Sequence, residues 1–176
     1  MGGLLMGCAS NNQPMAVVDH VDLKKYMGDW FVIGYTPLLV DKNAYNGIEN
    51  YKLNADGTIA TTYTFNKGAP DGPKKTYTPK GFVNDHPSNA LWGMQFLWPF
   101  KADYRIIYLN EAYTKVIVAR QARDYVWIMA RQPELSKPEY KKLVQVALDV
   151  GYSLEQIKKM PQPKNIESFK KNDGQG

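Results

Sequence analysis

The sequence predicts an all-β protein, an eight-stranded up-and-down antiparallel barrel with one C-terminal α-helix packed against its outside. Three observations lead to this fold class. Apolar and aromatic side chains recur at every second position from about residue 28 to residue 131, which is the period of a strand. Clusters of Gly, Pro, Asn and Asp separate these alternating segments, as turns require. A single segment with helical periodicity follows them.

Eight segments carry the strand pattern. In residues 58–65, for example, Ile59, Tyr63 and Phe65 share one face and threonines occupy the other. Successive segments are joined by short loops, so we expect each strand to pair with the one before it. Closing such a meander into a barrel removes its unpaired edges. The predicted strands lie near residues 29–37, 47–54, 58–66, 75–84, 90–97, 103–109, 114–121 and 125–131.

The predicted helix begins after Ser136, because Ser136 and Glu139 have the spacing of a capping box. Its apolar residues then fall on one face, which we expect to lie against the barrel; these are Tyr140, Leu143, Val144 and Ala147. Gly151 is a suitable residue to end the helix. A second short turn is expected between residues 153 and 160.

Length and composition limit the classes of site. The 176 residues make one domain, and a net charge of +5 argues neither for nor against an anionic partner. A single cysteine and two histidines exclude a cysteine-cluster or three-histidine metal site, so no metal and no cofactor is predicted. No apolar run is long enough for a membrane-spanning helix.

Two motifs resemble those of a known family. Gly28-Asp29-Trp30 follows a short segment, residues 21–27, and resembles the lipocalin signature of a helical plug and a Gly-X-Trp that opens the first strand. The segment 125–133 resembles the last lipocalin strand, whose arginine, here Arg131, lies across that tryptophan. Gly28, Trp30 and Arg131 are therefore expected to close one end of the barrel. The residues of these motifs most resemble those of the bacterial outer-membrane lipoprotein lipocalins of the Blc type, which are similar to apolipoprotein D.

The family's middle motif is weak in this chain. Where lipocalins have Thr-Asp-Tyr between strands six and seven, this sequence has Leu109-Asn110-Glu111, with Tyr113 nearby. Only Asn110 can supply the turn-forming side chain.

The first residues resemble a lipoprotein processing site. Leu5-Met6-Gly7-Cys8 is similar to a lipobox, whose cysteine becomes lipidated, and a polar segment follows. The alternative is that small and apolar residues precede this cysteine by chance. The resemblance divides the chain into a signal remnant and tether (1–19), a lipocalin barrel plus helix (20–160) and a flexible tail (161–176). It implies a lipid anchor at Cys8 that holds the protein on the periplasmic side of the bacterial outer membrane.

The family resemblance also implies an internal cavity for an apolar ligand. If Trp30 points inward, strand alternation places Val32 and Gly34 inside and Ile33 and Tyr35 outside. The same alternation on the other strands gives the expected ligand-binding residues: Tyr51, Tyr63, Phe65, Gly81, Val83, Met94, Phe96, Ile106, Tyr108, Val118, Tyr125 and Trp127. A substitution Gly81→Trp is expected to fill the bore without unfolding the barrel. Any one of these inward aromatic residues is more often explained as core filling.

Basic residues gather in the loops expected at the mouth, namely 37–47, 67–75, 97–103 and 120–125. They are Lys42, Lys67, Lys74, Lys75, Lys101, Arg120 and Arg123. Cationic loops around an apolar bore favour a guest with an anionic head group, a fatty acid or a lysophospholipid. Solvated surface is the alternative explanation of these charges.

Other functions receive less support. The chain has no Gly-X-Ser-X-Gly and no glycine-rich phosphate loop, and its histidines lie in an N-terminal arm and a turn, so we expect no enzyme. Its basic residues are too scattered to predict nucleic-acid binding. A structural or partner-binding envelope lipoprotein with no specific ligand remains the alternative, and a homodimer is left open.

Overall fold

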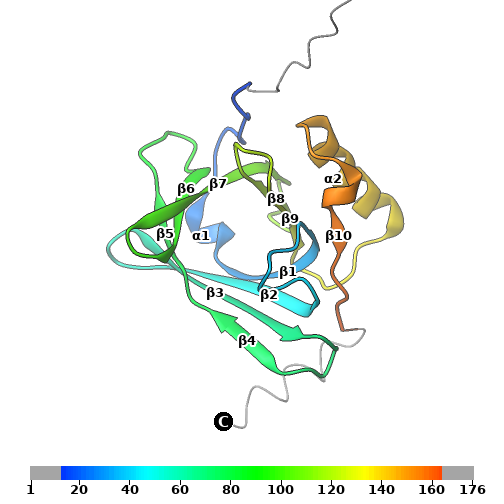
Figure 1. Cartoon of the computed structure of the whole chain (residues 1–176). Coiled ribbons are helices and arrows are strands. Elements are labelled where there is room, and N and C mark those ends of the chain that lie inside the picture. The colour runs from blue at the N-terminus through cyan, green and yellow to red at the C-terminus, as the bar shows by residue number, and fades with distance from the viewer. Residues whose placement is uncertain (1–12, 164–176) are drawn as a thin grey trace, which may run out of the picture.

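The computed structural model describes residues 13–163, in which eight antiparallel barrel strands surround one interior (Figure 1). Strand β1 pairs with β2 on one side and with β9 on the other, and this second pairing closes the barrel. The predicted eight-stranded barrel is therefore confirmed. The strands are β1 (Gly28–Tyr35), β2 (Ala44–Leu53), β3 (Thr58–Lys67), β4 (Lys74–Tyr77), β5 (Lys80–Val83), β6 (Leu91–Leu97), β7 (Phe100–Leu109), β8 (Lys115–Ala119) and β9 (Val126–Ala130).

The fourth barrel strand is divided into β4 and β5, both of which pair with β3. The single strand expected over 75–84 is corrected in this respect. The interruption falls at Thr78 and Pro79, and proline has no N–H with which to continue a ladder. The carbonyl of Pro79 still accepts a hydrogen bond from the Thr61 amide at 3.2 Å, so the two halves stay in one sheet.

A β-bulge changes the facing of the second half of β1. The register with β9 shifts between Val32 and Gly34. A Cβ built on Gly34 would lie 2.8 Å from the Tyr140 hydroxyl outside the barrel, whereas Tyr35 belongs to the inner core. The expectation that Gly34 faces inward and Tyr35 outward is therefore wrong, because the extra residue of the bulge reverses the alternation.

One end of the barrel is closed by α1 (Leu23–Tyr26). The Asp22 side chain caps this helix by accepting hydrogen bonds from the amides of Lys24 and Lys25. Tyr26 is fully buried, and its carbonyl accepts a hydrogen bond from the Trp30 indole at 2.8 Å. The opposite end, where β1 meets β2, β3 meets β4, β6 meets β7 and β8 meets β9, is called the mouth below.

The predicted C-terminal helix is α2 (Lys137–Asp149), which packs on the outside of the barrel (Figure 1). Ser136 and Glu139 form the expected capping box. Leu143 and Ala147 are buried in an outer core that also includes Ile128 of β9. Two short elements follow, η1 (Leu154–Gln156) and β10 (Lys158–Lys159). None of the helices within residues 13–163 has the length and apolarity needed to cross a membrane.

The segment after η1 fills a gap between β1 and β2. These two strands pair only as far as Phe31 and Ile48, and β10 then pairs with the end of β1. Beyond β10, the amide of Met160 donates to Ile33 and the carbonyl of Pro161 accepts from Asn46. The C-terminal segment therefore completes the barrel wall near the mouth.

Candidate ligand cavity

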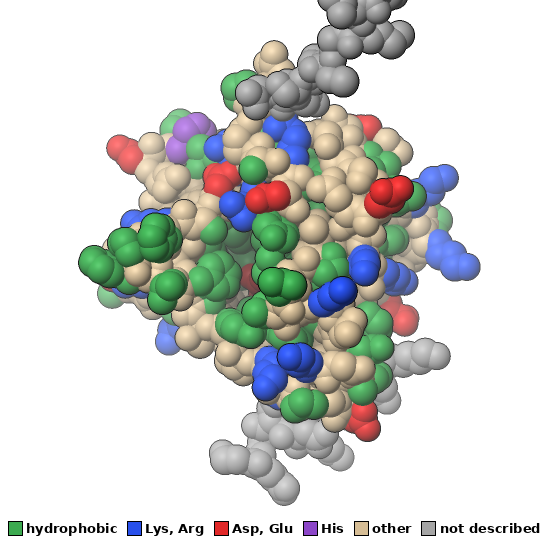
Figure 2. Space-filling view, viewed as in Figure 1, with side chains coloured by type: hydrophobic (Ala, Val, Ile, Leu, Met, Phe, Trp, Pro, Cys, Tyr) green, Lys and Arg blue, Asp and Glu red, His purple; other side chains and the backbone are tan. Residues whose placement is uncertain are grey.

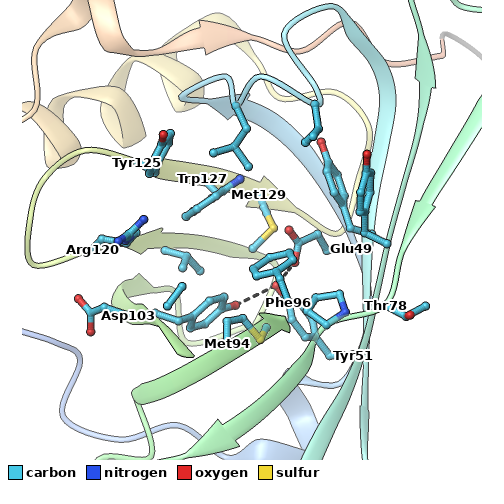
Figure 3. Close-up of a pocket in the computed structure, with 18 of the residues that line it drawn as sticks. Glu49, Tyr51, Thr78, Met94, Phe96, Asp103, Arg120, Tyr125, Trp127 and Met129 are labelled. Atoms are coloured by element: carbon cyan, nitrogen blue, oxygen red, sulfur yellow. Dashed lines mark hydrogen bonds between the residues drawn. The ribbon is translucent and has the colours of Figure 1, made fainter. Parts of the chain in front are cut away.

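A cavity of about 660 Å³ lies inside the barrel above the plug formed by α1. A cavity of this volume suits a single small ligand. Its wall is mostly apolar and aromatic, and it draws residues from all eight barrel strands or the loops between them (Figure 3). The lining consists of Leu38, Val40, Glu49, Tyr51, Tyr63, Thr76, Tyr77, Thr78, Pro79, Met94, Phe96, Ala102, Asp103, Tyr104, Val118, Arg120, Tyr125, Trp127 and Met129.

Seven of the twelve expected ligand-binding residues line this cavity. They are Tyr51, Tyr63, Met94, Phe96, Val118, Tyr125 and Trp127. Phe65 and Ile106 are buried in the inner core, and Val83 packs against it, so these three lie inside the barrel without lining the cavity.

The remaining two expected residues are placed differently. A second bulge shifts the register of β7 between Ile106 and Tyr108, and Tyr108 packs against the outer core instead of the interior. A Cβ on Gly81 would lie 3.1 Å from the Ile59 Cβ and 3.4 Å from the Met94 sulfur. A side chain at position 81 would therefore point toward Ile59 and Met94 and would require Ile59 to shift slightly, so Gly81→Trp as a way to fill the bore stays a prediction.

Several residues that line the cavity were not predicted from the sequence. Glu49 is two residues before Tyr51 on the same strand, so strand alternation places its side chain inside as well, although it was not among the predicted residues. Tyr104 has the same relation to Ile106. Leu38 and Val40 come from the β1–β2 loop, for which strand alternation makes no statement.

A chain of tyrosine hydroxyls connects the floor of the cavity to Glu49. The Tyr51 hydroxyl donates a hydrogen bond to the Glu49 carboxylate, and the Tyr104 hydroxyl donates to that of Tyr51 at 2.9 Å (Figure 3). The hydroxyls of Tyr104 and Tyr26 are 2.7 Å apart. Every hydroxyl in this buried chain therefore has a partner, as buried polar groups require.

Burial governs the ionisation of these groups. Removal from water raises the pKa of Glu49 to about 7; the Tyr51 hydrogen bond opposes this shift and the nearby Asp41 adds to it. Burial likewise raises the pKa values of Tyr26, Tyr51 and Tyr104 well above the usual tyrosine range. The tyrosines are therefore neutral hydrogen-bond donors. Among the groups joined by these hydrogen bonds, Glu49 is the one that titrates near neutrality.

The β1–β2 loop is fastened over the cavity by a second carboxylate. Asp41 accepts a hydrogen bond from the Leu38 amide at 2.6 Å and another from the Tyr63 hydroxyl at 3.1 Å. Its own carbonyl accepts from the Tyr35 hydroxyl at 2.8 Å. Burial raises the pKa of Asp41 to about 6. These bonds hold Leu38 and Val40 at the cavity wall.

At the closed end, the Arg131 guanidinium lies 3.8 Å from the centre of the Trp30 ring. Its nitrogens donate hydrogen bonds to five backbone carbonyls, among them those of Asp29 at 2.7 Å and Met27 at 2.8 Å. Gly28 has φ +95°, which favours glycine, and a Cβ there would lie 3.5 Å from the guanidinium. The structure thus brings Gly28, Trp30 and Arg131 together in a cap beneath the cavity.

The neighbouring turn follows the weak middle motif. The side-chain oxygen of Asn110 accepts from the amides of Thr114 and Lys115 at 2.8 and 2.7 Å. The Tyr113 hydroxyl accepts from the Asp22 amide at 2.9 Å, which ties this turn to the plug. Asn110 therefore forms the turn as expected, and Tyr113 adds a contact to the closed end.

Of the basic residues expected at the mouth, only Arg120 lines the cavity. It lies 3.4 Å from the carboxylate of Asp124. Asp103, the other charged residue at this level of the wall, bonds to Arg105 at 2.8 Å. No group of three His, Cys, Asp or Glu side chains within the described part of the chain could hold a metal ion. Cys8 and residues 164–176 lie outside the described residues.

Comparison with known proteins assigns the family. Residues 21–162 match the model of the lipocalin-like domain. The chain is similar to the outer membrane lipoprotein Blc of Citrobacter freundii, with 29% identity over 164 residues that cover 91% of each chain. It is also similar to temperature-induced lipocalin-1 of Arabidopsis thaliana, with 27% identity over 162 residues that cover 87% of this chain and 86% of the relative.

Solved structures agree on the fold. Insecticyanin from the tobacco hornworm Manduca sexta superposes with a TM-score of 0.66 at 13% identity, with 84% of each chain covered. Lipocalins bind small hydrophobic ligands and are typically carriers rather than enzymes. The family match over most of the chain and the closed barrel with its outer helix lead to one conclusion. This chain belongs to the lipocalin-like family.

Proposed function

We propose that this protein binds a small hydrophobic ligand in its barrel and stores or carries it at the bacterial cell envelope, without catalysing a reaction. The observation that supports this function most directly is the cavity of about 660 Å³, whose wall is mostly apolar and aromatic. Burial of apolar ligand surface in such a space supplies affinity without any reactive group.

The ligand that we propose is a fatty acid or a lysophospholipid. Its acyl chain would lie along Met94, Val118 and Trp127, and its anionic head would lie near Arg120 at the mouth. Each methylene buried contributes about 0.8 kcal/mol, whereas a solvated head-group ion pair contributes about 0–1 kcal/mol. The chain, more than the head group, would therefore determine the affinity.

Titration with fatty acids of increasing chain length tests this function. Affinity should rise with each methylene until the cavity is full, and it should fall only slightly in high salt. Ala102→Trp, which places a large ring on the cavity wall, should abolish binding, and Ala60→Trp on the exposed face of β3 should not. Binding that ignores chain length and disappears in salt would indicate a surface electrostatic site instead. Absence of any saturable site would favour a structural or partner-binding envelope protein.

The envelope location rests on the N-terminal motif and on the relatives. The relative from Citrobacter freundii is named an outer membrane lipoprotein. By the same chemistry we expect acylation of Cys8 and attachment to the periplasmic side of the outer membrane; stable anchoring takes two or more acyl chains. In a bacterial host, palmitate label should enter the protein expressed behind a complete signal sequence and should be absent from Cys8→Ser. Label that persists in that variant would exclude Cys8 as the anchor.

A further inference from the structure

Glu49 is a carboxylate in an apolar cavity, and no cationic side chain of residues 13–163 pairs with it. It stands opposite Trp30 in the β1–β2 pairing and opposite Tyr63 in the β2–β3 pairing, which places it just above the closed end. One carboxylate oxygen accepts from Tyr51, and the other has no hydrogen-bond partner among the described residues. Figure 3 shows the Glu49 side chain pointing into the enclosed space.

The other charged residues of the cavity wall do not neutralise Glu49. Arg120 pairs with Asp124 and Asp103 pairs with Arg105, and these ion pairs belong to the mouth. Arg131 lies across Trp30 and donates its hydrogen bonds to backbone carbonyls. The deep part of the cavity thus presents a hydrogen-bond acceptor that carries negative charge and lacks a counter-ion.

Aromatic side chains line the cavity that contains this acceptor. The rings that line the cavity together with Glu49 are those of Tyr51, Tyr63, Tyr77, Phe96, Tyr104, Tyr125 and Trp127. A cation is attracted to the faces of aromatic rings, and an ammonium also donates strong hydrogen bonds to a carboxylate. A carboxylate at the base of an aromatic-walled pocket is therefore a complementary site for an ammonium group.

We propose that Glu49 recognises a second class of ligand, an amphiphilic primary amine whose ammonium bonds to Glu49 while its apolar body fills the barrel. This inference rests on the proposed function in one respect, since it uses the same cavity for apolar burial. It differs in orientation, because the head group of an amine lies at the floor, whereas that of a fatty acid lies at the mouth.

The ionisation of Glu49 makes amine binding depend on pH. The titratable groups that act on Glu49 are Asp41 from the β1–β2 loop and the tyrosines at positions 26, 51, 63 and 104. Burial keeps these tyrosines neutral. Asp41, with a pKa of about 6, loses its proton in the same range and adds negative field. Amine affinity should therefore rise as the pH increases through 7.

Competition between two ligands of equal chain length tests the inference. Dodecylamine, which stays protonated, and the neutral dodecanol would each displace an uncharged fluorescent probe from the wild type, Glu49→Gln and Glu111→Gln. Glu111 is exposed in the β7–β8 turn, so its variant matches the charge change alone. We expect Glu49→Gln to weaken dodecylamine at least about tenfold and dodecanol less than about twofold, because a bond to a charged group is lost. Glu111→Gln should change neither.

The pH provides a second measurement on the unmodified protein. From about pH 8.5 to about pH 5.5, dodecylamine should lose affinity relative to dodecanol in the wild type and not in Glu49→Gln. Equal amine affinity in wild type and Glu49→Gln would overturn the inference, and so would an equal loss of both ligands. If the probe itself finds no saturable site in the wild type, the proposed function fails as well. If the probe binds saturably but the ratio of dodecylamine to dodecanol affinity is the same in wild type and Glu49→Gln, only the role of Glu49 is refuted and the proposed function stands.

Discussion

The guanidinium of Arg131 donates to five backbone carbonyls and stacks on Trp30 at 3.8 Å. These carbonyls belong to the α1 region, to the start of β1 and to the turn before β8. Only a planar group with several donors can reach them together. Burial lowers the pKa of Arg131, but an arginine remains charged throughout the physiological range. Its shape therefore matters as much as its charge.

Substitutions at the closed end should separate shape from charge. Arg131→Lys keeps the charge and loses most of the hydrogen bonds, so the free energy of unfolding should fall by about 1–3 kcal/mol. Trp30→Ala should cost about 3–5 kcal/mol, because Trp30 is fully buried. Arg105→Lys, in which a partly exposed arginine pairs with Asp103, is the control and should cost less than 1 kcal/mol. Urea denaturation measures all three, and a wild-type midpoint for Arg131→Lys would contradict the argument.

Glu49 should also make the free energy of unfolding depend on pH. The direction of this dependence should be opposite to that produced by a salt-bridged carboxylate. Its pKa rises from 4.5 to about 7 on folding, so between these values the folded protein binds more protons than the unfolded chain. The free energy of unfolding should then decrease as pH rises from about 4.5 to 7, and be unaffected by Glu49 below both values. The loss is at most about 3 kcal/mol, and less where water reaches the cavity.

Denaturation of Glu49→Gln across this pH range tests the effect. The variant should be more stable than the wild type at about pH 8 and equal to it at about pH 4. Asp41, whose pKa is also raised, contributes a decrease of the same sign in both proteins, so the comparison reports the effect of Glu49 together with its coupling to Asp41. Two stability profiles that run parallel over the whole range would show that Glu49 is not penalised by burial.

The barrel wall between β1 and β2 depends on the C-terminal segment around Met160 and Gln162. The side-chain amide of Gln162 donates to the carbonyls of Val32 and Gly47, at 2.7 and 2.9 Å. The Met160 side chain is buried and accepts from the Gly47 amide through its sulfur. A Cβ on Gly47 would overlap that sulfur, so the absence of a side chain at position 47 allows this approach.

Gln162→Ala should therefore weaken the barrel wall. Two carbonyls would lose the same donor, and we expect a cost of about 1–3 kcal/mol. The Asn46 amide, which donates to Pro161, should exchange its hydrogen faster. In the control Gln145→Ala, an exposed glutamine of α2 loses its bond to Asp149, and both measurements should remain near wild type. Unchanged exchange at Asn46 in Gln162→Ala would show that the wall holds without this bridge.

Elements with strong periodicity could be predicted from the sequence, and their irregularities could not. The α2 capping box and the Leu143 face follow from spacing within a few residues. The bulges at Val32 and Ile106 depend on how two strands pair, which local alternation does not reveal. Pro79 is a partial exception, because a proline within a predicted strand already argues for an interruption.

The same limit explains the cavity. Aromatic residues such as Tyr63 and Trp127 were found because apolar alternation marks an inward face. Glu49 has the same alternation but was not predicted, because a charged residue does not contribute to an apolar pattern. A buried carboxylate is nevertheless the kind of exception that marks a functional site. The prediction that Tyr108 faces the cavity was wrong for a different reason: the bulge before it reverses the facing of the strand.

For the whole molecule, exposed apolar surface is confined to one end. Within residues 13–163, all the large hydrophobic side chains that are exposed lie at the mouth, on the β1–β2 loop, on the β6–β7 hairpin and in η1; they are Leu39, Val40, Phe96, Leu97, Trp98, Phe100 and Leu154. Figure 2 shows hydrophobic side chains gathered over this hairpin and around the opening. Patches of this kind mark contact with an apolar partner, and the proposed function predicts a lipid surface as that partner.

Binding to lipid vesicles should depend on the hairpin tip. Leu97 and Trp98 are 73% and 81% exposed, so replacing both with serine should leave the fold unchanged. The double variant should bind vesicles of phosphatidylcholine and phosphatidylglycerol at least about tenfold more weakly, because apolar surface is lost. Ala112→Ser, exposed at the closed end, should bind as the wild type does. Co-sedimentation measures this, and equal binding by the double variant would exclude the hairpin from the contact.

The N-terminal arm runs along the barrel toward the mouth, where the carbonyl of Gln13 accepts hydrogen bonds from Gln121 and Arg123, both at 3.1 Å. Only four residues lie between Cys8 and Gln13, and the five steps from one Cα to the next span at most about 17 Å. If Cys8 carries a lipid, this tether keeps the opening close to the membrane that holds it. A short tether creates a high effective concentration of one partner around the other. The lipids of that membrane would then be presented to the cavity as a local supply, and even a weakly bound lipid would occupy it for much of the time.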